Sequence, residues 1–177
     1  MVWTSPMTAV AFEPFSAAEF NTHVRDNLLE TEAAKATNAG SYLVSTGLHT
    51  VDWRRAVNDN TQSTTSTSST SFVTLSPDIW VQVNTGTTAL VIVSAALWNS
   101  TGDVAAMSHM VTGATEISAT HDWSLINEQN NTQVLQMCHA HLHTNLTPGL
   151  NTFRAQYQAP NGGTASFTRR HITVLPF

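Results

Sequence analysis

The sequence predicts a mainly β protein, in which an N-terminal extended arm and a single α-helix precede an antiparallel β-sandwich of jelly-roll type. Three observations predict this class: only one stretch has helical periodicity, short apolar runs follow it at strand-like spacing, and turn residues separate those runs. The 177 residues suffice for one domain with a short appendage. We expect residues 1–60 to hold the arm, the helix and a small hairpin, and residues 61–177 to form the sandwich.

The helix has a clear start signal. Ser16 can cap it, Glu19 three residues later can close a capping box, and Phe15 can pack on Phe20 as a hydrophobic staple. The preceding residues 1–14 show no periodicity and predict an extended arm. The helix is expected to end near residues 35–40. Its narrow apolar stripe favours contact with a partner, and the residues predicted for attachment or oligomerisation are Trp3, Phe15, Phe20, Val24 and Leu28.

The remaining elements are predicted from alternation and turns. Residues 42–45 and 49–53 around Gly47 predict a hairpin. Residues 61–71 are Ser or Thr except for Gln62, which fits either a flexible linker or an exposed edge strand. Residues 89–97 form a continuous apolar run, which predicts a strand buried on both faces. The other expected strands cover residues 79–83, 104–111, 121–126, 132–143, 152–158 and 165–175.

Composition excludes several classes of function. Only 11% of the residues are charged, and the chain has 27 Thr, 16 Ser and 13 Asn, so its surface is expected to consist of hydroxyls and amides. Lys35 is the sole lysine, and no basic patch is present for nucleic acid. No apolar window approaches the length of a membrane span. The single cysteine, Cys138, cannot form an internal disulfide.

A candidate metal site lies in the sequence Cys138–His143. In a strand His139, His141 and His143 would share one face, about 7 Å apart, which is too far for one strand to hold an ion. Around a three-fold axis, histidine pairs from three chains could supply six nitrogens to a transition metal. The competing interpretation is a polar strand face exposed to solvent or to a neighbouring subunit, with Cys138 packed in the core. We therefore assign neither a metal nor a cofactor.

Catalytic patterns are weak. Ser94 lacks the flanking glycines of a nucleophile elbow, and no glycine-rich phosphate loop occurs. Glu116, Asp122 and Glu128 could pair as in a glycosidase, but such scattered acids are more often turn or surface residues. The sequence thus predicts a protein that is not an enzyme. Five tryptophans could stack on sugars or become buried, and burial is the commoner fate.

Two regions resemble virion proteins of tailed phages that infect actinobacteria, usually labelled minor tail proteins. Residues 15–28, FSAAEFNTHVRDNL, are similar to the family's TAAQLNTHLRDN helix and follow Trp3-Thr4-x-Pro6. The C-terminal similarity lies in residues 81–91, 146–153 and 163–176. This sequence departs from the family in having Phe20 where Leu is usual and histidines at residues 139–143.

The resemblance implies a non-enzymatic structural protein on the surface of the phage particle, assembled in the cytoplasm of the bacterial host. It implies a homotrimer, attached to other virion proteins through the N-terminal arm, whose β domain projects outward and can contact a host cell-surface glycan. The leading hypothesis is a tail-associated fibre or minor tail protein, and the alternative is a capsid fibre or decoration protein. Two further alternatives come from the residues themselves. The tryptophans could form the glycan platform of a carbohydrate-binding module, and two paired carboxylates could serve a small depolymerase.

Overall fold

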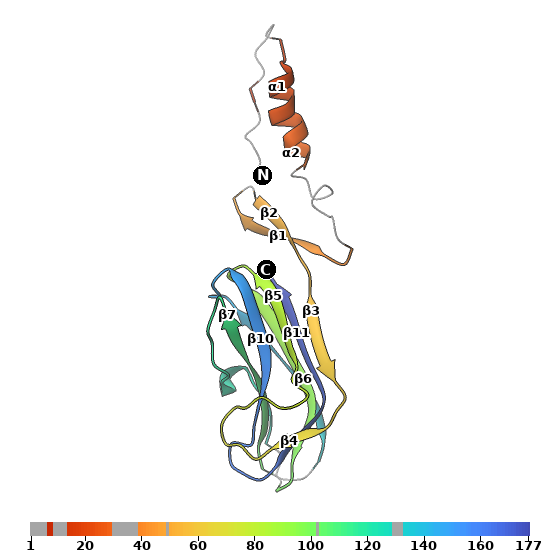
Figure 1. The fold of residues 1–177 in the computed structure, drawn as a ribbon, viewed down its shortest axis with the longest axis vertical. Coiled ribbons are helices and arrows are strands. Elements are labelled where there is room, and N and C mark those ends of the chain that lie inside the picture. Colours follow the sequence, from red (N-terminus) through yellow and green to blue (C-terminus); the bar gives the residue numbers. More distant parts are fainter. Residues whose placement is uncertain (1–6, 9–13, 30–38, 49, 102, 129–132) are drawn as a thin grey trace. The chain divides into compact units, whose positions relative to one another are not determined.

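The computed structural model describes residues 7–8, 14–29, 39–48, 50–101, 103–128 and 133–177 (Figure 1). The chain divides into two compact units, Met1–Arg55 with Phe177, and Ala56–Pro176. The predicted boundary after residue 60 falls inside the first strand of the second unit, Val57–Thr61. No helix in the described ranges is long and apolar enough to cross a membrane.

In the first unit the helix begins where the sequence predicts. It consists of α1 (Ala17–Phe20), a π-helical turn η1 (Asn21–Arg25) and α2 (Asp26–Leu29). Ser16 Oγ accepts a hydrogen bond from Glu19 N at 3.2 Å, and Ser16 N donates to Glu19 Oε2 at 2.8 Å, which confirms the capping box. The Ser16 hydrogen bonds lower the pKa of Glu19. The Phe15 and Phe20 rings pack edge to face, with centroids 6.0 Å apart.

Ser16→Ala is expected to destabilise this helix by about 1 kcal/mol, because the first turn loses its side-chain acceptor. Faster amide hydrogen exchange at Glu19 would measure the loss. Ser16→Asp keeps an acceptor at the cap and should preserve the protection. Equal protection in the alanine variant and the parent protein would contradict a stabilising role for the cap.

The predicted hairpin is present in the same unit. β1 (Tyr42–Gly47) pairs antiparallel with β2 (Thr50–Arg54) in a register that places Tyr42 opposite Arg54. The Tyr42 ring also lies 6.2 Å from the ring of Phe177. The predicted arm, including Trp3, and the predicted helix end near residues 35–40 lie mostly or wholly outside the described residues.

The second unit is a sandwich of two antiparallel sheets (Figure 1). One sheet has the order β3-β11-β6-β9, with β4 also paired to β11, and the other has the order β5-β10-β7-β8. Without the short β4 the sandwich has eight strands, and from the outermost pair inward in the sequence β3 pairs with β11, β5 with β10, β6 with β9 and β7 with β8. This nested pairing is the jelly-roll topology. The strands are β3 (Val57–Thr61), β4 (Thr65–Thr67), β5 (Trp80–Thr85), β6 (Ala89–Asn99), β7 (Ala105–Gly113), β8 (Leu125–Asn127), β9 (Leu135–His143), β10 (Gly149–Gln158) and β11 (Ala165–Pro176).

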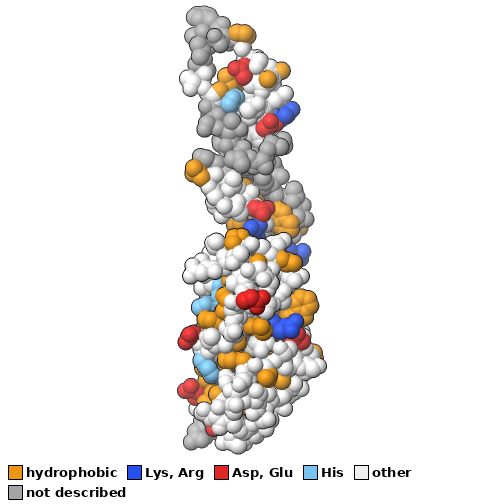
Figure 2. Space-filling model, turned by 60° about the vertical axis from the view of Figure 1, so that its left-hand side comes forward, with side chains coloured by type: hydrophobic (Ala, Val, Ile, Leu, Met, Phe, Trp, Pro, Cys, Tyr) orange, Lys and Arg blue, Asp and Glu red, His pale blue; other side chains and the backbone are white. Residues whose placement is uncertain are grey.

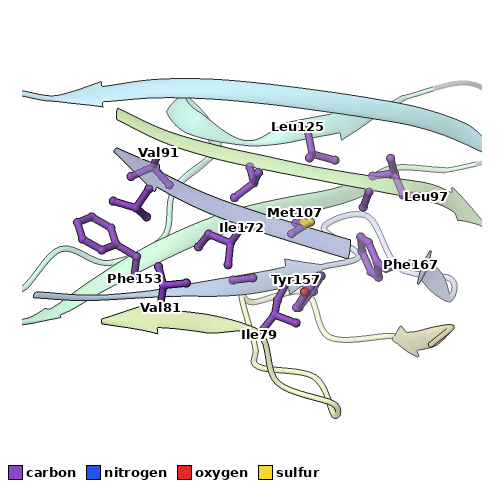
Figure 3. Packing of buried hydrophobic residues seen from close by; sticks show 14 of the residues in the cluster. Ile79, Val81, Val91, Leu97, Met107, Leu125, Phe153, Tyr157, Phe167 and Ile172 are labelled. Atoms are coloured by element: carbon purple, nitrogen blue, oxygen red, sulfur yellow. The ribbon is translucent and has the colours of Figure 1, made fainter. Parts of the chain in front are cut away.

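The hydrophobic core lies between the two sheets (Figure 3). Phe153 and Tyr157 point inward from β10, and Phe167 and Ile172 point inward from β11. The rings of Tyr157 and Phe167 are 4.9 Å apart, and neither side chain is exposed. Burial of this apolar area is the main stabilising contribution to the sandwich.

A β-bulge in β11 allows both halves of that strand to face the core. Between Thr168 and His171 the strand has one more residue than its partner β6, and Arg169 adopts a φ of 50°. Because side chains alternate along a strand, the extra residue exchanges the set of side chains that faces the core with the set that faces outward. Phe167 before the bulge and Ile172 after it are therefore both buried.

The same bulge turns Arg170 into the sandwich, where its side chain is fully buried. Its guanidinium carbon lies 5.2 Å from the centroid of the Tyr157 ring, a cation–π arrangement. Burial raises the pKa of Tyr157 to about 12, although the charge on Arg170 opposes that shift.

Three local expectations change in the structure. Residues 61–71 contribute β4 and the end of β3, so the edge-strand reading applies to part of this run. In β6 full burial mostly alternates with half-burial, so the expectation of burial on both faces is wrong for much of its length. The strand expected over residues 121–126 is instead a 3₁₀ turn, η2 (His121–Trp123), followed by the short β8, because Thr120 Oγ1 accepts a hydrogen bond from Asp122 N at 3.1 Å.

Candidate functional site

The most distinctive polar arrangement in the sandwich is a cluster of His109, Trp123, His141 and His143, here called the histidine cluster. β9 supplies His141 and His143 from the edge of one sheet, β7 supplies His109 from the other sheet, and η2 supplies Trp123. β9 is an edge strand of its sheet and β7 is next to the edge strand β8 of the other sheet, so the cluster lies near one edge of the sandwich.

Two imidazoles meet at the centre of the cluster. The Nε2 atoms of His109 and His143 are 2.8 Å apart, and both side chains are buried. A hydrogen bond at this distance requires one nitrogen to carry a proton and the other to accept it. His109 Nδ1 is buried without a partner in the described part of the chain. Because an orphaned buried N–H is rarer than an orphaned acceptor, we assign the donor to His109 Nε2.

The outer members of the cluster pack on this pair. The ring centroid of His141 lies 4.6 Å from that of His143 and 4.9 Å from that of Trp123. Trp123 Nε1 donates a hydrogen bond to the backbone oxygen of His109 at 3.1 Å, which ties η2 to β7.

The electrostatics of the cluster favour neutral imidazoles. Burial, followed by the charges of His143, His141 and His139, holds the pKa of His109 well below its ordinary value. Burial and His141 lower the pKa of His143 to about 4. The pKa of His141 is also lowered, mainly by burial and then by His139, while Asp122 opposes the shift. At neutral pH the cluster is therefore an uncharged hydrogen-bonded and aromatic contact.

The structure places the histidine strand differently from either sequence interpretation. The faces alternate as expected, but the histidines face inward, His143 is buried, and Cys138 is exposed. The expectation that Cys138 packs in the core is wrong, because the inner face of β9 is the one covered by β7 and η2. His109 was not predicted as part of a site, and Trp123 was considered only as one of five tryptophans that could stack on sugars or become buried. No local pattern marks either residue as a neighbour of the β9 histidines.

The metal prediction gains no support from this geometry. In the described ranges, no group of three or more His, Cys, Asp or Glu residues is arranged to hold a metal ion. His143 is engaged by His109 of its own chain, which removes its Nε2 from a site shared between chains.

The residues predicted for attachment lie in the first unit. Phe20 and Leu28 are 48% and 60% exposed, Phe15 is also exposed, and Val24 is half-buried. The helix therefore presents apolar side chains at its surface. Trp3 lies outside the described residues.

No protein-family model and no curated protein match the chain. Among solved structures, Eiger TNF from S. frugiperda is similar at 10% identity and a TM-score of 0.45, over 70% of this chain and 92% of that one. The infectious bursal disease virus VP2 subviral particle has 8% identity and a TM-score of 0.44, over 75% and 37% of the two chains. TmCBM61 in complex with β-1,4-galactotriose has 12% identity and a TM-score of 0.33, over 77% and 83%. Similarities of this size assign no function.

Proposed function

We propose that the protein is a non-enzymatic structural component of a tailed-phage particle, a homotrimeric tail-associated fibre or minor tail protein. Its N-terminal unit attaches it to other virion proteins, and its sandwich contacts the host surface. The observation that carries the proposal is the division into a unit containing a capped helix and a separate jelly roll with its own core.

The exposed side chains of the helix support an attachment role. Phe15, Phe20 and Leu28 are large apolar residues that stay exposed in a single copy of the chain. About half of each side chain is already covered, so burying the rest would stabilise an assembly by roughly 1 kcal/mol per residue. A second and third copy of the helix, or a protein of the particle, can supply the covering surface.

The sandwich supports an outward-facing role. Its core is complete within residues 56–176, so it does not need the first unit to bury its apolar residues. White surface, which is backbone and uncharged polar side chains, covers much of the face drawn in Figure 2, and charged side chains are few there. This agrees with a surface built from hydroxyls and amides.

The test is immunogold labelling of intact particles with an antibody to the sandwich. Gold at the tail is the expected result, gold over the head would instead assign a capsid fibre or decoration protein, and unlabelled particles would contradict the proposal.

Deletion of residues 1–14 should leave the unfolding temperature of the sandwich unchanged but remove the protein from particles. Full copy number of the deletion variant on particles would contradict attachment through the arm.

Light scattering of the purified full chain should give the mass of a trimer. The mass of a monomer would overturn the trimeric part of the proposal.

A further inference from the structure

A second polar surface lies on the outer face of the other sheet, where β5 and β10 pair. The register places Trp80 opposite Arg154 and Gln82 opposite Thr152. Asp78, just before β5, forms an ion pair with Arg154. We call these five residues the Trp80 face.

Trp80 is an exposed aromatic side chain on a fixed backbone. It is 44% exposed, whereas Trp98 and Trp123 in the same unit are half-buried. Its backbone N–H donates to Asp59 Oδ2 of β3 at 3.0 Å, which holds the start of β5 in place. A tryptophan has one apolar plane and one N–H donor, and such a side chain on a rigid strand is suited to contact a ligand that is apolar on one side and polar at its rim.

The polar groups beside Trp80 are held in place but keep free hydrogen-bonding capacity. Arg154 Nε lies 3.3 Å from Asp78 Oδ2, and Gln82 Nε2 donates to Thr152 Oγ1 at 3.0 Å. Within the described part of the chain, the Nη atoms of Arg154, the Oε1 of Gln82 and the indole N–H of Trp80 make no hydrogen bond. The Nη atoms of Arg154 and the indole N–H of Trp80 can therefore donate hydrogen bonds to a ligand, and Oε1 of Gln82 can accept one.

Within the Trp80 face the charges of Asp78 and Arg154 cancel, and the neighbouring carboxylate of Asp59 accepts the backbone N–H of Trp80. An anionic ligand that approached Arg154 would also meet the carboxylate of Asp78, and a cationic ligand would meet the guanidinium. The face is therefore complementary to an uncharged ligand that carries many hydroxyl groups. A sugar ring fits this chemistry, because its C–H groups form an apolar face and its hydroxyls both donate and accept.

We propose that the Trp80 face is a binding site for a neutral saccharide, whose ring stacks on Trp80 and whose hydroxyls bond Arg154 and Gln82. The inference names a ligand class for the proposed host-contact function. It rests on that function for the statement that the saccharide is displayed on the host surface. The site is open and has one aromatic plane, so weak binding is expected, with Kd on the order of 0.1–1 mM per site.

The test is binding of the full-length protein to an array of short neutral hexose and pentose oligosaccharides, with acidic oligosaccharides and bare linker on the same array. Binding to at least one neutral saccharide is expected, and titration of that saccharide should show Trp80→Ala to bind about tenfold or more weakly. Trp53→Ala is the matched control, because Trp53 is also 44% exposed but lies in the first unit. The folding of both variants is checked by their unfolding temperatures.

Three outcomes would overturn the inference: no binding to any neutral saccharide, binding to acidic saccharides alone, or equal loss in the Trp53 and Trp80 variants. Where Trp80→Ala unfolds, Arg154→Met and Gln82→Leu test the same face and should also weaken binding. Failure of the inference is distinct from failure of the proposed function, since particle labelling does not depend on a sugar. A protein that binds sugar at Trp80 but is absent from particles would retain the site and refute the virion role.

Discussion

Gly113→Ala is expected to destabilise the sandwich by about 3 kcal/mol or more. Gly113 ends β7 with a φ of +105°, a region that L side chains rarely adopt. A Cβ atom at this position would lie 2.5 Å from the backbone oxygen of Leu150 in β10. The substitution therefore adds the strain of a positive φ to a clash with backbone that cannot rotate away. Chemical denaturation of both proteins measures the difference.

Gly162→Ala is the matched control for that variant. Gly162 has a φ of +99°, but nothing lies within 4 Å of the added Cβ. The Gly162→Ala variant should lose only the free energy of unfolding that corresponds to the backbone strain, about 1–2 kcal/mol. Equal losses of stability at the two positions would show that the β7–β10 contact tolerates a side chain and would contradict the close approach of Gly113 to Leu150.

Acidification is expected to destabilise the protein through the histidine cluster. The pKa values of His109 and His143 lie below the value of about 6.5 that histidine has in an unfolded chain. As the pH falls below about 6.5, the unfolded state binds protons that the folded state does not, so stability decreases until the pH passes the folded pKa, about 4 for His143. The expected loss is on the order of 2 kcal/mol, after a discount for solvent screening at the edge of the sandwich.

The double variant His109→Leu/His143→Leu isolates this effect. It removes both members of the buried pair together, so neither imidazole stays buried without its partner, while His141 is kept. The variant should lose less stability than the parent protein between pH 7 and pH 4, measured by denaturation at each pH. Leu142→Gln, on the exposed face of β9, removes no ionisable group and should keep the parental pH dependence. An unchanged pH profile in the double variant would contradict the account of neutral buried imidazoles.

Much of the fold can be predicted from local sequence signals. The capping box needs only Ser16 and Glu19, which are three residues apart, and the structure forms it as predicted. The β1–β2 hairpin and most sandwich strands follow from alternation and from turn residues such as Gly113. These features are recoverable because the atoms that stabilise them lie close together in the chain.

Local signals fail where a side chain depends on a distant partner. Alternation placed His139, His141 and His143 on one face of a strand, but it could not tell whether that face looks inward or outward. The answer depends on β7 and η2, which cover the inner face of β9. For the same reason the exposure of Cys138 could not be predicted.

The sequence by itself thus determines a β-sandwich that is poor in charge and follows a capped helix in the chain. Composition is a sum over residues, and alternation, turns and the cap depend only on neighbours a few residues apart. The contact between His109 and His143, which are 34 residues apart, exists only once β7 and β9 are brought together in opposite sheets. The inward turn of Arg170 likewise depends on a bulge that β11 forms against β6. In both cases strand pairing across long sequence separations sets the direction of the side chain, because one residue of register or bulge exchanges the inner and outer faces.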